Sequence, residues 1–215
     1  MSKIFLDQLF DPKRKEVFQQ LSEFEKSAVL GGGTALALQI GHRKSYDFDL
    51  FTANPISPVI KQKLMITFGK KNIQILNDTT SELTFFTKKG IKITFLHFPF
   101  PPLHPLVTNL SLPLFNIKDL ASNKAYLLGR RAVYRDYMDF YFLLYQGISL
   151  KQIIKESAER FAGGFSEKLF LEQLTYFEDL DDFEIEFTGE KKPTPPEVKE
   201  FLEKGVKDYL QIPQE

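Results

Sequence analysis

The stretch GGGTALALQIGHRKSYDFDLF, residues 31–51, joins a glycine turn, a short apolar segment and two aspartates. The apolar residues 28–30 precede the glycines and predict a buried strand that ends at them. Thr34 follows the glycines and is the predicted N-cap of a short helix over 35–40. Residues 46–51 alternate with a period of two, which predicts a second strand. The stretch therefore predicts a strand, a tight turn, a helix and a returning strand.

Two aspartates on the second predicted strand are candidate metal ligands. Asp47 and Asp49 are two residues apart, so in a strand both project to the same side. Two such carboxylates repel each other unless a cation lies between them, and hard divalent ions such as Mg²⁺ prefer oxygen ligands. The glycine turn before a helix offers backbone N–H groups that suit phosphate. A phosphate cradle and a pair of metal-binding carboxylates are therefore predicted to face each other across one cleft.

Each part of this pattern also has a plainer interpretation. A glycine run that ends a strand is more often only a tight turn, because glycine tolerates backbone angles that other residues avoid. An Asp-x-Asp pair at a strand end is more often solvated than bound to metal. Here aromatic and aliphatic residues flank the pair, which favours a strand in the core sheet, where carboxylates need a partner.

The rest of the first half of the chain also predicts α/β structure. Helices are expected over residues 12–26 and from Ser57-Pro58 to about residue 68. Strands are expected over 72–76, 82–87 and 91–98, the last two joined as a hairpin. A connection without helix or inner strand is predicted where prolines gather, at positions 99, 101, 102, 105 and 113.

Beyond the prolines the apolar period becomes helical. Helices are expected over 117–128, 134–145, 150–161, 167–177 and 197–209. The sequence thus predicts an α/β (α+β) protein with two domains, residues 1–113 and 114–215. The first would hold a small mixed sheet with flanking helices, and the second would be helical.

Composition excludes several classes of protein. The net charge is zero, with 28 basic and 28 acidic residues, which is unlike a general nucleic-acid coat protein. The chain has no cysteine, which excludes disulfides, zinc–thiolate sites and cysteine nucleophiles. The N-terminal segment lacks a signal-peptide core, and no stretch approaches the ~18 apolar residues of a membrane span. We therefore expect a cytoplasmic protein with no membrane partner.

The quoted stretch resembles the first motif of the nucleotidyltransferase superfamily that includes DNA polymerase beta. Within that superfamily it resembles the AbiEii/AbiGii toxin family, through the Gly-Gly-Thr-Ala-Leu-Ala-Leu start, the Gly41-His42-Arg43 block and Ser45 before the aspartates. Two later blocks also match: IKDLASNK at 117–124, then GRR followed by RDYMDFY at 135–141. The resemblance covers about residues 25–145, and the region 176–179 resembles the family more weakly.

The resemblance implies a role for each matched residue. Asp47 and Asp49 would be catalytic and bind one or two Mg²⁺ or Mn²⁺ ions. Nucleotide-binding roles are implied for Gly32, Gly33, Thr34, Arg43, Ser45, Lys124 and Arg135. The roles of Asp119, Asp136 and Asp139, which match later motifs, are less fixed.

One position departs from the superfamily pattern. A third carboxylate is usual on a neighbouring strand, and Ile91-Lys92-Ile93-Thr94-Phe95-Leu96 places Thr94 there. A threonine cannot ionise, so either another residue serves, with Glu82 on the partner strand as one candidate, or the activity is weak. The departure bears on catalysis and leaves the expected fold unchanged.

The later motifs also allow structural interpretations. Asp119 near a helix start suits the helix dipole, and Lys124 is more often a solvated lysine. Asp136 and Asp139, three residues apart on a helix, would either hold arginines or contact substrate. A basic cluster that suits a polyphosphate or an RNA backbone, or forms surface ion pairs, comprises Lys118, Lys124, Arg130, Arg131 and Arg135.

The function that the resemblance implies is nucleotidyl transfer by a toxin. A nucleoside monophosphate (NMP) would pass from a nucleoside triphosphate (NTP) to RNA, such as a tRNA end, or to a protein, and a cognate antitoxin would be a partner. The alternative is a catalytically weak member that binds nucleotide, RNA or a partner protein. A third hypothesis is a structural or interaction protein in which the motif is accidental.

Overall fold

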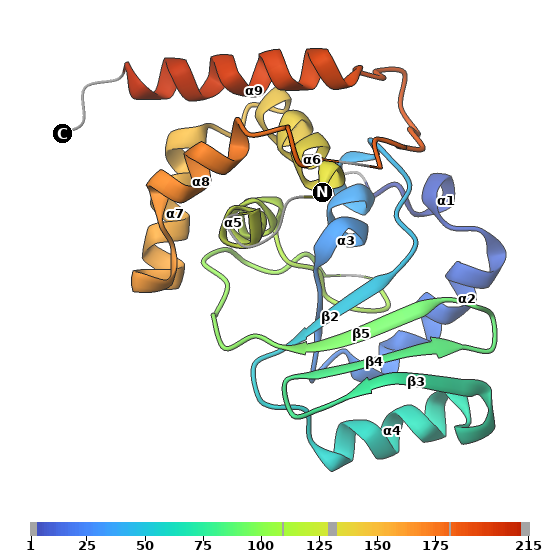
Figure 1. Cartoon of the computed structure of the whole chain (residues 1–215). Coiled ribbons are helices and arrows are strands. Elements are labelled where there is room, and N and C mark those ends of the chain that lie inside the picture. Colours follow the sequence, from blue (N-terminus) through green and yellow to red (C-terminus); the bar gives the residue numbers. More distant parts are fainter. Residues whose placement is uncertain (1–3, 109, 129–132, 181, 212–215) are drawn as a thin grey trace. The chain divides into compact units, whose positions relative to one another are not determined.

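The computed structural model describes residues 4–108, 110–128, 133–180 and 182–211. The chain divides into two compact units, Met1–Asn116 and Ile117–Glu215. The first unit combines a sheet with helices, and the second is helical in the residues that are described (Figure 1). No helix within the described ranges is long and apolar enough to cross a membrane.

The sheet of the first unit is mixed, as the sequence predicts. Within the described residues it has five strands in the order β1-β2-β5-β4-β3. β2 and β5 run parallel, and every other neighbouring pair is antiparallel. The strands are β1 (Val29–Leu30), β2 (Phe48–Thr52), β3 (Ile73–Asp78), β4 (Glu82–Thr87) and β5 (Lys92–His97). The predicted hairpin is confirmed as β4 and β5.

Local capping explains where two helices of this unit begin. The Asp11 carboxylate accepts a hydrogen bond from the Arg14 backbone N–H at the start of α2. Ser57 caps α4, and Pro58 occupies its first turn, where a missing N–H costs nothing. The helices are α1 (Leu6–Leu9), α2 (Pro12–Gln20), η1 (Leu21–Phe24), α3 (Gly32–Ile40), α4 (Pro58–Phe68) and η2 (Lys70–Asn72). The helix expected over 12–26 therefore ends as a 3-10 turn.

The predicted cap of α3 is wrong. The helix begins at Gly32, with Gly31 as its N-cap, so Thr34 lies inside the first turn. The reason is the backbone of Gly32, whose φ of +63° starts the helix earlier than a residue with a side chain would allow. The Thr34 hydroxyl is thereby released for other contacts.

The two faces of the sheet differ in character because paired residues on neighbouring strands share a face. The buried rows Phe48–Ile93–Phe85 and Leu50–Phe95–Leu83 form the apolar face. Helical aromatics pack on it, with Phe18 stacked on Phe48 and Phe24 against Phe95. On the opposite face the matching row is Asp49–Thr94–Thr84. The polar residues therefore lie on the face that α2 and η1 do not cover.

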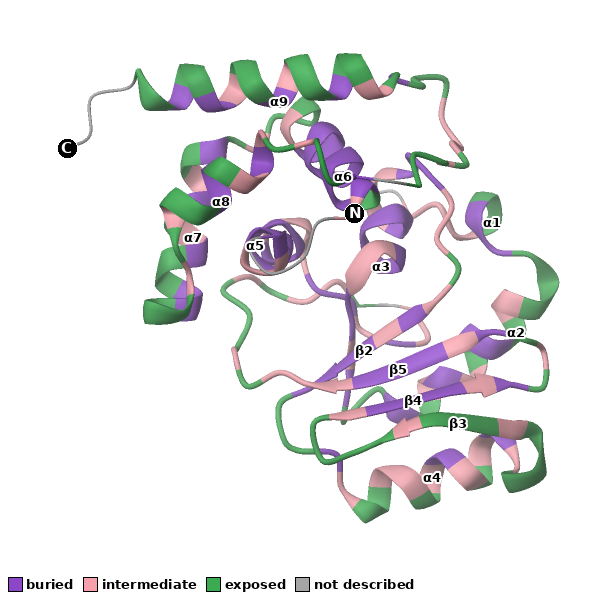
Figure 2. Cartoon of the chain, viewed as in Figure 1, coloured by how far each residue is buried: buried purple, intermediate pink, exposed green. Residues whose placement is uncertain are grey.

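In the helical unit the first three predicted helices have the expected bounds. The helices are α5 (Ile117–Leu128), α6 (Tyr134–Tyr145), α7 (Leu150–Phe161), η3 (Ala162–Gly164), α8 (Glu167–Leu174) and α9 (Pro195–Leu210). α9 begins two residues before the prediction, because Glu197 accepts a hydrogen bond from the Thr194 backbone N–H and Pro195 fits the first turn. Figure 2 shows α6 buried along most of its length, whereas α4 buries only Leu64 and Phe68.

A buried ion pair joins α5 to α7. Arg160 Nη1 lies 3.3 Å from Asp119 Oδ1, and the two side chains are 1% and 0% exposed. The same nitrogen is 3.1 Å from both the Asp119 carbonyl oxygen and Ser122 Oγ. Burial lowers the pKa of Arg160, and the Asp119 charge opposes that shift. These contacts therefore offset part of the free-energy cost of removing the Arg160 guanidinium from water.

We expect Arg160→Met to destabilise the helical unit strongly. The substitution leaves the Asp119 carboxylate buried without its cation, which costs about 3–5 kcal/mol in free energy of unfolding. Urea denaturation followed by circular dichroism measures the loss. Lys199→Met is the matched control, because Lys199 pairs with Glu203 at 3.8 Å on an exposed helix surface and such pairs contribute under ~1 kcal/mol. Equal losses of unfolding free energy in the two variants would contradict the stabilising role of the buried Arg160–Asp119 pair.

Candidate functional site

The turn between β1 and α3 brings the backbone against Asp49. A Cβ atom on Gly32 would lie 2.2 Å from Asp49 Oδ2, which is far inside contact distance. The Gly31 N–H donates to the Asp49 carbonyl oxygen at 2.9 Å. The carboxylate therefore lies at the N-terminus of α3, where the helix dipole favours negative charge. Only glycine allows this approach at position 32.

The next glycine makes room for a buried arginine. A Cβ atom on Gly33 would lie 2.7 Å from Arg43 Nη2 and 3.2 Å from Ser45 Oγ. Arg43 is 4% exposed, and its Nη1 donates to the Lys44 carbonyl oxygen at 2.9 Å. The structure thus places the Arg43 guanidinium beside the N-terminus of α3. Both features attract anions.

The Thr34 side chain makes its hydrogen bonds to other parts of the protein. Its side chain is buried, and its hydroxyl lies 2.9 Å from Ser45 Oγ and donates to the Asp47 carbonyl oxygen. These bonds attach the segment before β2 to α3. Thr34 therefore positions the backbone of Asp47 relative to the glycine turn.

Asp47 has a lysine partner that the sequence analysis did not select. Lys92 Nζ on β5 lies 3.4 Å from Asp47 Oδ2, with the two side chains 37% and 47% exposed. The strand period could have indicated this residue, because Lys92 is two positions before Thr94 and so shares its face. A pair this exposed contributes under ~1 kcal/mol, so another cation can displace the lysine.

Thr94 lies directly opposite Asp49 in the parallel register of β2 and β5. On its other side it pairs with Thr84, and the two hydroxyl oxygens are 3.3 Å apart. Thr84 Oγ1 in turn donates to Glu82 Oε1 at 2.6 Å. A hydrogen-bonded row therefore leads from the position beside Asp49 to the carboxylate of Glu82.

The donor atoms of this face fit a divalent cation that arrives with a phosphate. Asp47 and Asp49 supply hard oxygen ligands, and the described part of the chain contains no cluster of three or more metal-binding side chains. Mg²⁺ is commonly held by one or two carboxylates, with substrate phosphates completing its shell. The glycine turn and Arg43 are suitable neighbours for such a phosphate. The site thus matches a metal–polyphosphate complex better than a metal alone.

The helical unit contains a second charged cluster. Lys124 Nζ lies 2.7 Å from Asp136 Oδ1 and 2.6 Å from Asp139 Oδ2, and all three side chains are less than a tenth exposed. The interpretation of Lys124 as a solvated lysine is therefore wrong. The two aspartates hold a lysine that lies twelve or more residues earlier in the chain. Whether they also hold arginines stays a prediction.

The remaining predicted residues are dispersed. Asp119 pairs with Arg160, a partner that lies 41 residues away and was not selected from the sequence. Arg135 is exposed on α6. Arg130 and Arg131 lie outside the described residues, so the predicted basic cluster is seen only in part.

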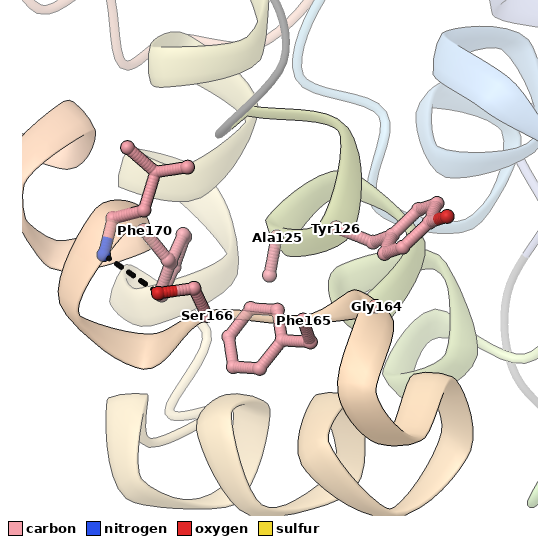
Figure 3. Close-up of a pocket in the computed structure, with 7 residues that line it drawn as sticks. Ala125, Tyr126, Gly164, Phe165, Ser166 and Phe170 are labelled. Carbon is pink, nitrogen blue, oxygen red and sulfur yellow. Dashed lines mark hydrogen bonds between the residues drawn. The ribbon is translucent and has the colours of Figure 1, made fainter.

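A pocket of about 310 Å³ opens in the helical unit between α5, η3 and α8 (Figure 3). Its lining is mainly apolar and uncharged: Ala125, Tyr126, Gly164, Phe165, Ser166, Leu169 and Phe170. The Ser166 hydroxyl accepts a hydrogen bond from the Leu169 N–H and caps α8. The lining residues carry no positive charge that would favour a phosphate.

Comparison with known proteins shows the relationship of this chain. The model of a family described as nucleotidyl transferase AbiEii toxin, type IV toxin–antitoxin system, matches residues 17–211. An uncharacterized protein of Aquifex aeolicus (strain VF5) is 32% identical over 211 residues, covering 92% of this chain and 99% of its own.

Two solved structures share the fold. MenT4, a nucleotidyltransferase toxin from Mycobacterium tuberculosis H37Rv, aligns with a TM-score of 0.64 at 13% identity, over 94% of this chain and 82% of its own. JHP933 from Helicobacter pylori aligns with a TM-score of 0.53 at 15% identity, over 94% and 95% of the two chains. At these identities the likeness concerns the fold alone.

We expect Gly32→Ala to damage the site beyond its effect on stability. The positive φ alone costs about 1–2 kcal/mol with a side chain present, and the new methyl group also displaces the Asp49 carboxylate. Mn²⁺ titration followed by electron paramagnetic resonance should show at least a ~10-fold loss of affinity.

Gly90→Ala is the matched control for this prediction. Gly90 has a φ of +75°, and nothing lies within 4 Å of an added Cβ. It should lose similar stability and keep the Mn²⁺ affinity of the wild type. A Gly32→Ala variant that binds Mn²⁺ like the wild type would contradict the assigned contact.

Proposed function

The chain belongs to the AbiEii family of nucleotidyl transferase toxins, and from this premise we propose that it transfers NMP from an NTP to an RNA or protein acceptor with Mg²⁺. The observation that carries the proposal is the contact of the Asp49 carboxylate with the glycine turn at the N-terminus of α3. This contact supports the proposal because carboxylate oxygens, which suit Mg²⁺, lie beside backbone N–H groups, which suit phosphate. A metal–triphosphate complex requires both.

The reaction follows from the chemistry of the site. An acceptor oxygen attacks the α-phosphorus, a new O–P bond forms, and pyrophosphate leaves. Gly32 and Gly33 offer backbone N–H groups to the triphosphate, and Arg43 adds a positive charge beside them. Asp47 and Asp49 would hold Mg²⁺, which when bound neutralises charge on the attacking and leaving oxygens. Catalysis by these groups consists mainly of positioning and charge stabilisation.

Lys124 and Arg135 remain proposed nucleotide contacts with unequal support. Arg135 is exposed and can reach a ligand without breaking an ion pair seen here. Lys124 is paired with two buried aspartates, so contact with a triphosphate would require it to give up part of that pairing. The structure supports a stabilising role for the Lys124 cluster at least as well as a binding role.

The second candidate function is binding, by a chain that is a catalytically weak member of the family. The observation that favours it is Thr94, which presents a neutral hydroxyl opposite Asp49. Such a protein would bind nucleotide without turnover and would act through RNA or a partner protein. Because the matched family is described as part of a toxin–antitoxin system, we also propose a cognate antitoxin as a partner.

The test is incubation of the chain with each α-³²P-labelled NTP, Mg²⁺ and total cellular RNA or protein extract. We expect label from one NTP to appear in a macromolecule. Asp49→Asn should reduce this transfer at least ~100-fold, because changes outside the ligand shell of metal sites already cost 10–100-fold. Asp78→Asn is the matched control, since Asp78 pairs with Lys61 and should transfer normally.

Thermal shift separates the two candidate functions. Saturating Mg-NTP at ~100 times its Kd should stabilise the wild type by about 2.7 kcal/mol, and Asp49→Asn should lose this effect. A shift without label transfer would favour the catalytically weak protein. If the wild type shows neither a thermal shift nor label transfer with any NTP, both candidate functions are contradicted.

A further inference from the structure

An aromatic side chain lies among polar groups on the face of the sheet that holds Asp49. Phe86 on β4 lies directly opposite Lys92 on β5 and Gln74 on β3, so these three residues share that face. The Phe86 ring is half-buried and makes no ring or cation contact with a described residue. Its neighbour Phe85 is instead fully buried on the apolar face. Phe86 therefore offers a flat apolar surface in a polar neighbourhood.

The groups beside this ring can form hydrogen bonds. Gln74 is exposed, and Asn77 lies opposite Thr84 in the next row of the same face. Neither amide side chain has a hydrogen-bond partner among the described residues. Figure 2 shows β3 exposed along most of its length. An apolar partner would leave these amides without hydrogen bonds, whereas the edge of a nucleobase can bond to them.

A nucleobase fits both parts of this surface. Its faces are flat and stack on aromatic rings, and its edges donate and accept hydrogen bonds. Single-stranded RNA has bases that are free to unstack from one another, and other sheet surfaces bind such bases through aromatic side chains. A single strand is therefore the form of nucleic acid that the Phe86 ring suits.

Three lysines lie at one end of β3 and β4. Lys88 directly follows β4, and Lys70 and Lys71 belong to η2, immediately before β3. Thr87 pairs with Ile73, so the register brings the three lysines to the same end of the two strands. All three are exposed, and none forms an ion pair with a described residue. Unpaired lysines attract nucleic-acid phosphates, so this basic edge is complementary in charge to RNA.

The ring is near enough to the proposed metal ligands for one strand of RNA to reach both. Lys92, opposite Phe86, has its Nζ 3.4 Å from Asp47 Oδ2. β4 is the second strand from β2 in the sheet, and neighbouring strands are about 4.8 Å apart, so the separation is roughly 10 Å. About three nucleotides cover this distance at the ~3.4 Å rise of a stacked strand, and fewer cover it in an extended strand.

We propose that Phe86 stacks on a base near the end of a single-stranded RNA acceptor and that the basic edge binds the phosphates before it. The inference rests on the proposed function, for which it selects RNA over protein as the acceptor. The terminal hydroxyl of this RNA lies at Asp47 and Asp49, where it attacks the α-phosphorus. Stacking holds the strand without reading its sequence, since every base has a flat face.

The first test is the binding of a fluorescein-labelled single-stranded RNA of mixed sequence, measured by fluorescence anisotropy. Phe86→Leu keeps an apolar side chain but loses the flat ring, so the Kd should rise roughly 5-fold or more. Phe86→Tyr keeps the ring and should bind like the wild type, which separates stacking from packing. The Mg-NTP thermal shift should be equal in all three proteins. An unchanged Kd in Phe86→Leu would overturn the inference, and so would a lost Mg-NTP shift, because the ring would then bind the donor nucleotide.

The second test is the salt dependence of the same binding. Replacing the three lysines of the basic edge by glutamine should lower the slope of log Kd against log[KCl] by about 2, at ~0.7 for each phosphate contact with a single strand. The charge-matched control replaces Lys155, Lys204 and Lys207, which are exposed lysines of the helical unit, and should keep the wild-type slope. Equal slopes in the two triple variants would overturn the role of the basic edge.

Label transfer separates the inference from the function on which it rests. With α-³²P-NTP and RNA, Phe86→Leu should raise the KM for RNA and leave the KM for NTP unchanged. A wild type that labels a protein and binds no single-stranded RNA would overturn the inference and leave the proposed function standing. A wild type that binds RNA through Phe86 but transfers no label from any NTP would overturn the proposed function, and with it the assignment of the RNA as acceptor.

Discussion

The site depends on the absence of a side chain at Gly32. The Asp49 carboxylate occupies the space that a β-carbon would take, and the positive φ of Gly32 allows α3 to start there. With a side chain at this position, α3 could not approach β2, and the carboxylate would move away from the helix N-terminus. Thr34 strengthens the same junction through Ser45 and the Asp47 carbonyl oxygen. The glycine turn, α3 and β2 therefore form one unit, and its backbone conformation determines where the Asp49 carboxylate lies.

In the helical unit, residues that match functional motifs also hold the helices together. Asp119 is paired with Arg160 across α5 and α7, and Lys124 lies between two aspartates of α6. Buried charges are costly unless each has a partner, so none of these residues can be removed without affecting its neighbours. Loss of activity on substitution of Lys124 would therefore not by itself place the lysine at the substrate. The stability of the variant has to be measured beside its activity.

The sequence predicted most helix and strand positions because they depend on local periodicity and caps. The bounds of α4, α5, α6 and α7 follow from Ser57-Pro58 and from the apolar period. The start of α3 could not be predicted, since it depends on the φ of Gly32 in contact with a residue of the next strand. The buried pairs were missed for a related reason, because Arg160 lies 41 residues from Asp119. Alternation places Asp47 and Asp49 on one face, but only the strand register brings Thr94 beside Asp49 and Thr84 beside Thr94.

The neutral residue opposite Asp49 has an electrostatic consequence. Side chains directly opposite on neighbouring strands are about 5 Å apart, and at an effective dielectric constant of ~20 two like charges at that distance repel by roughly 3 kcal/mol. A carboxylate at position 94 would add this repulsion to that between Asp47 and Asp49 whenever no divalent cation is bound. Thr94 avoids it, and Lys92 already offsets part of the charge on Asp47. Glu82 lies further along the row, hydrogen-bonded to Thr84, where repulsion from Asp49 is weaker. The arrangement therefore limits the repulsion between carboxylates on this face when no divalent cation is bound.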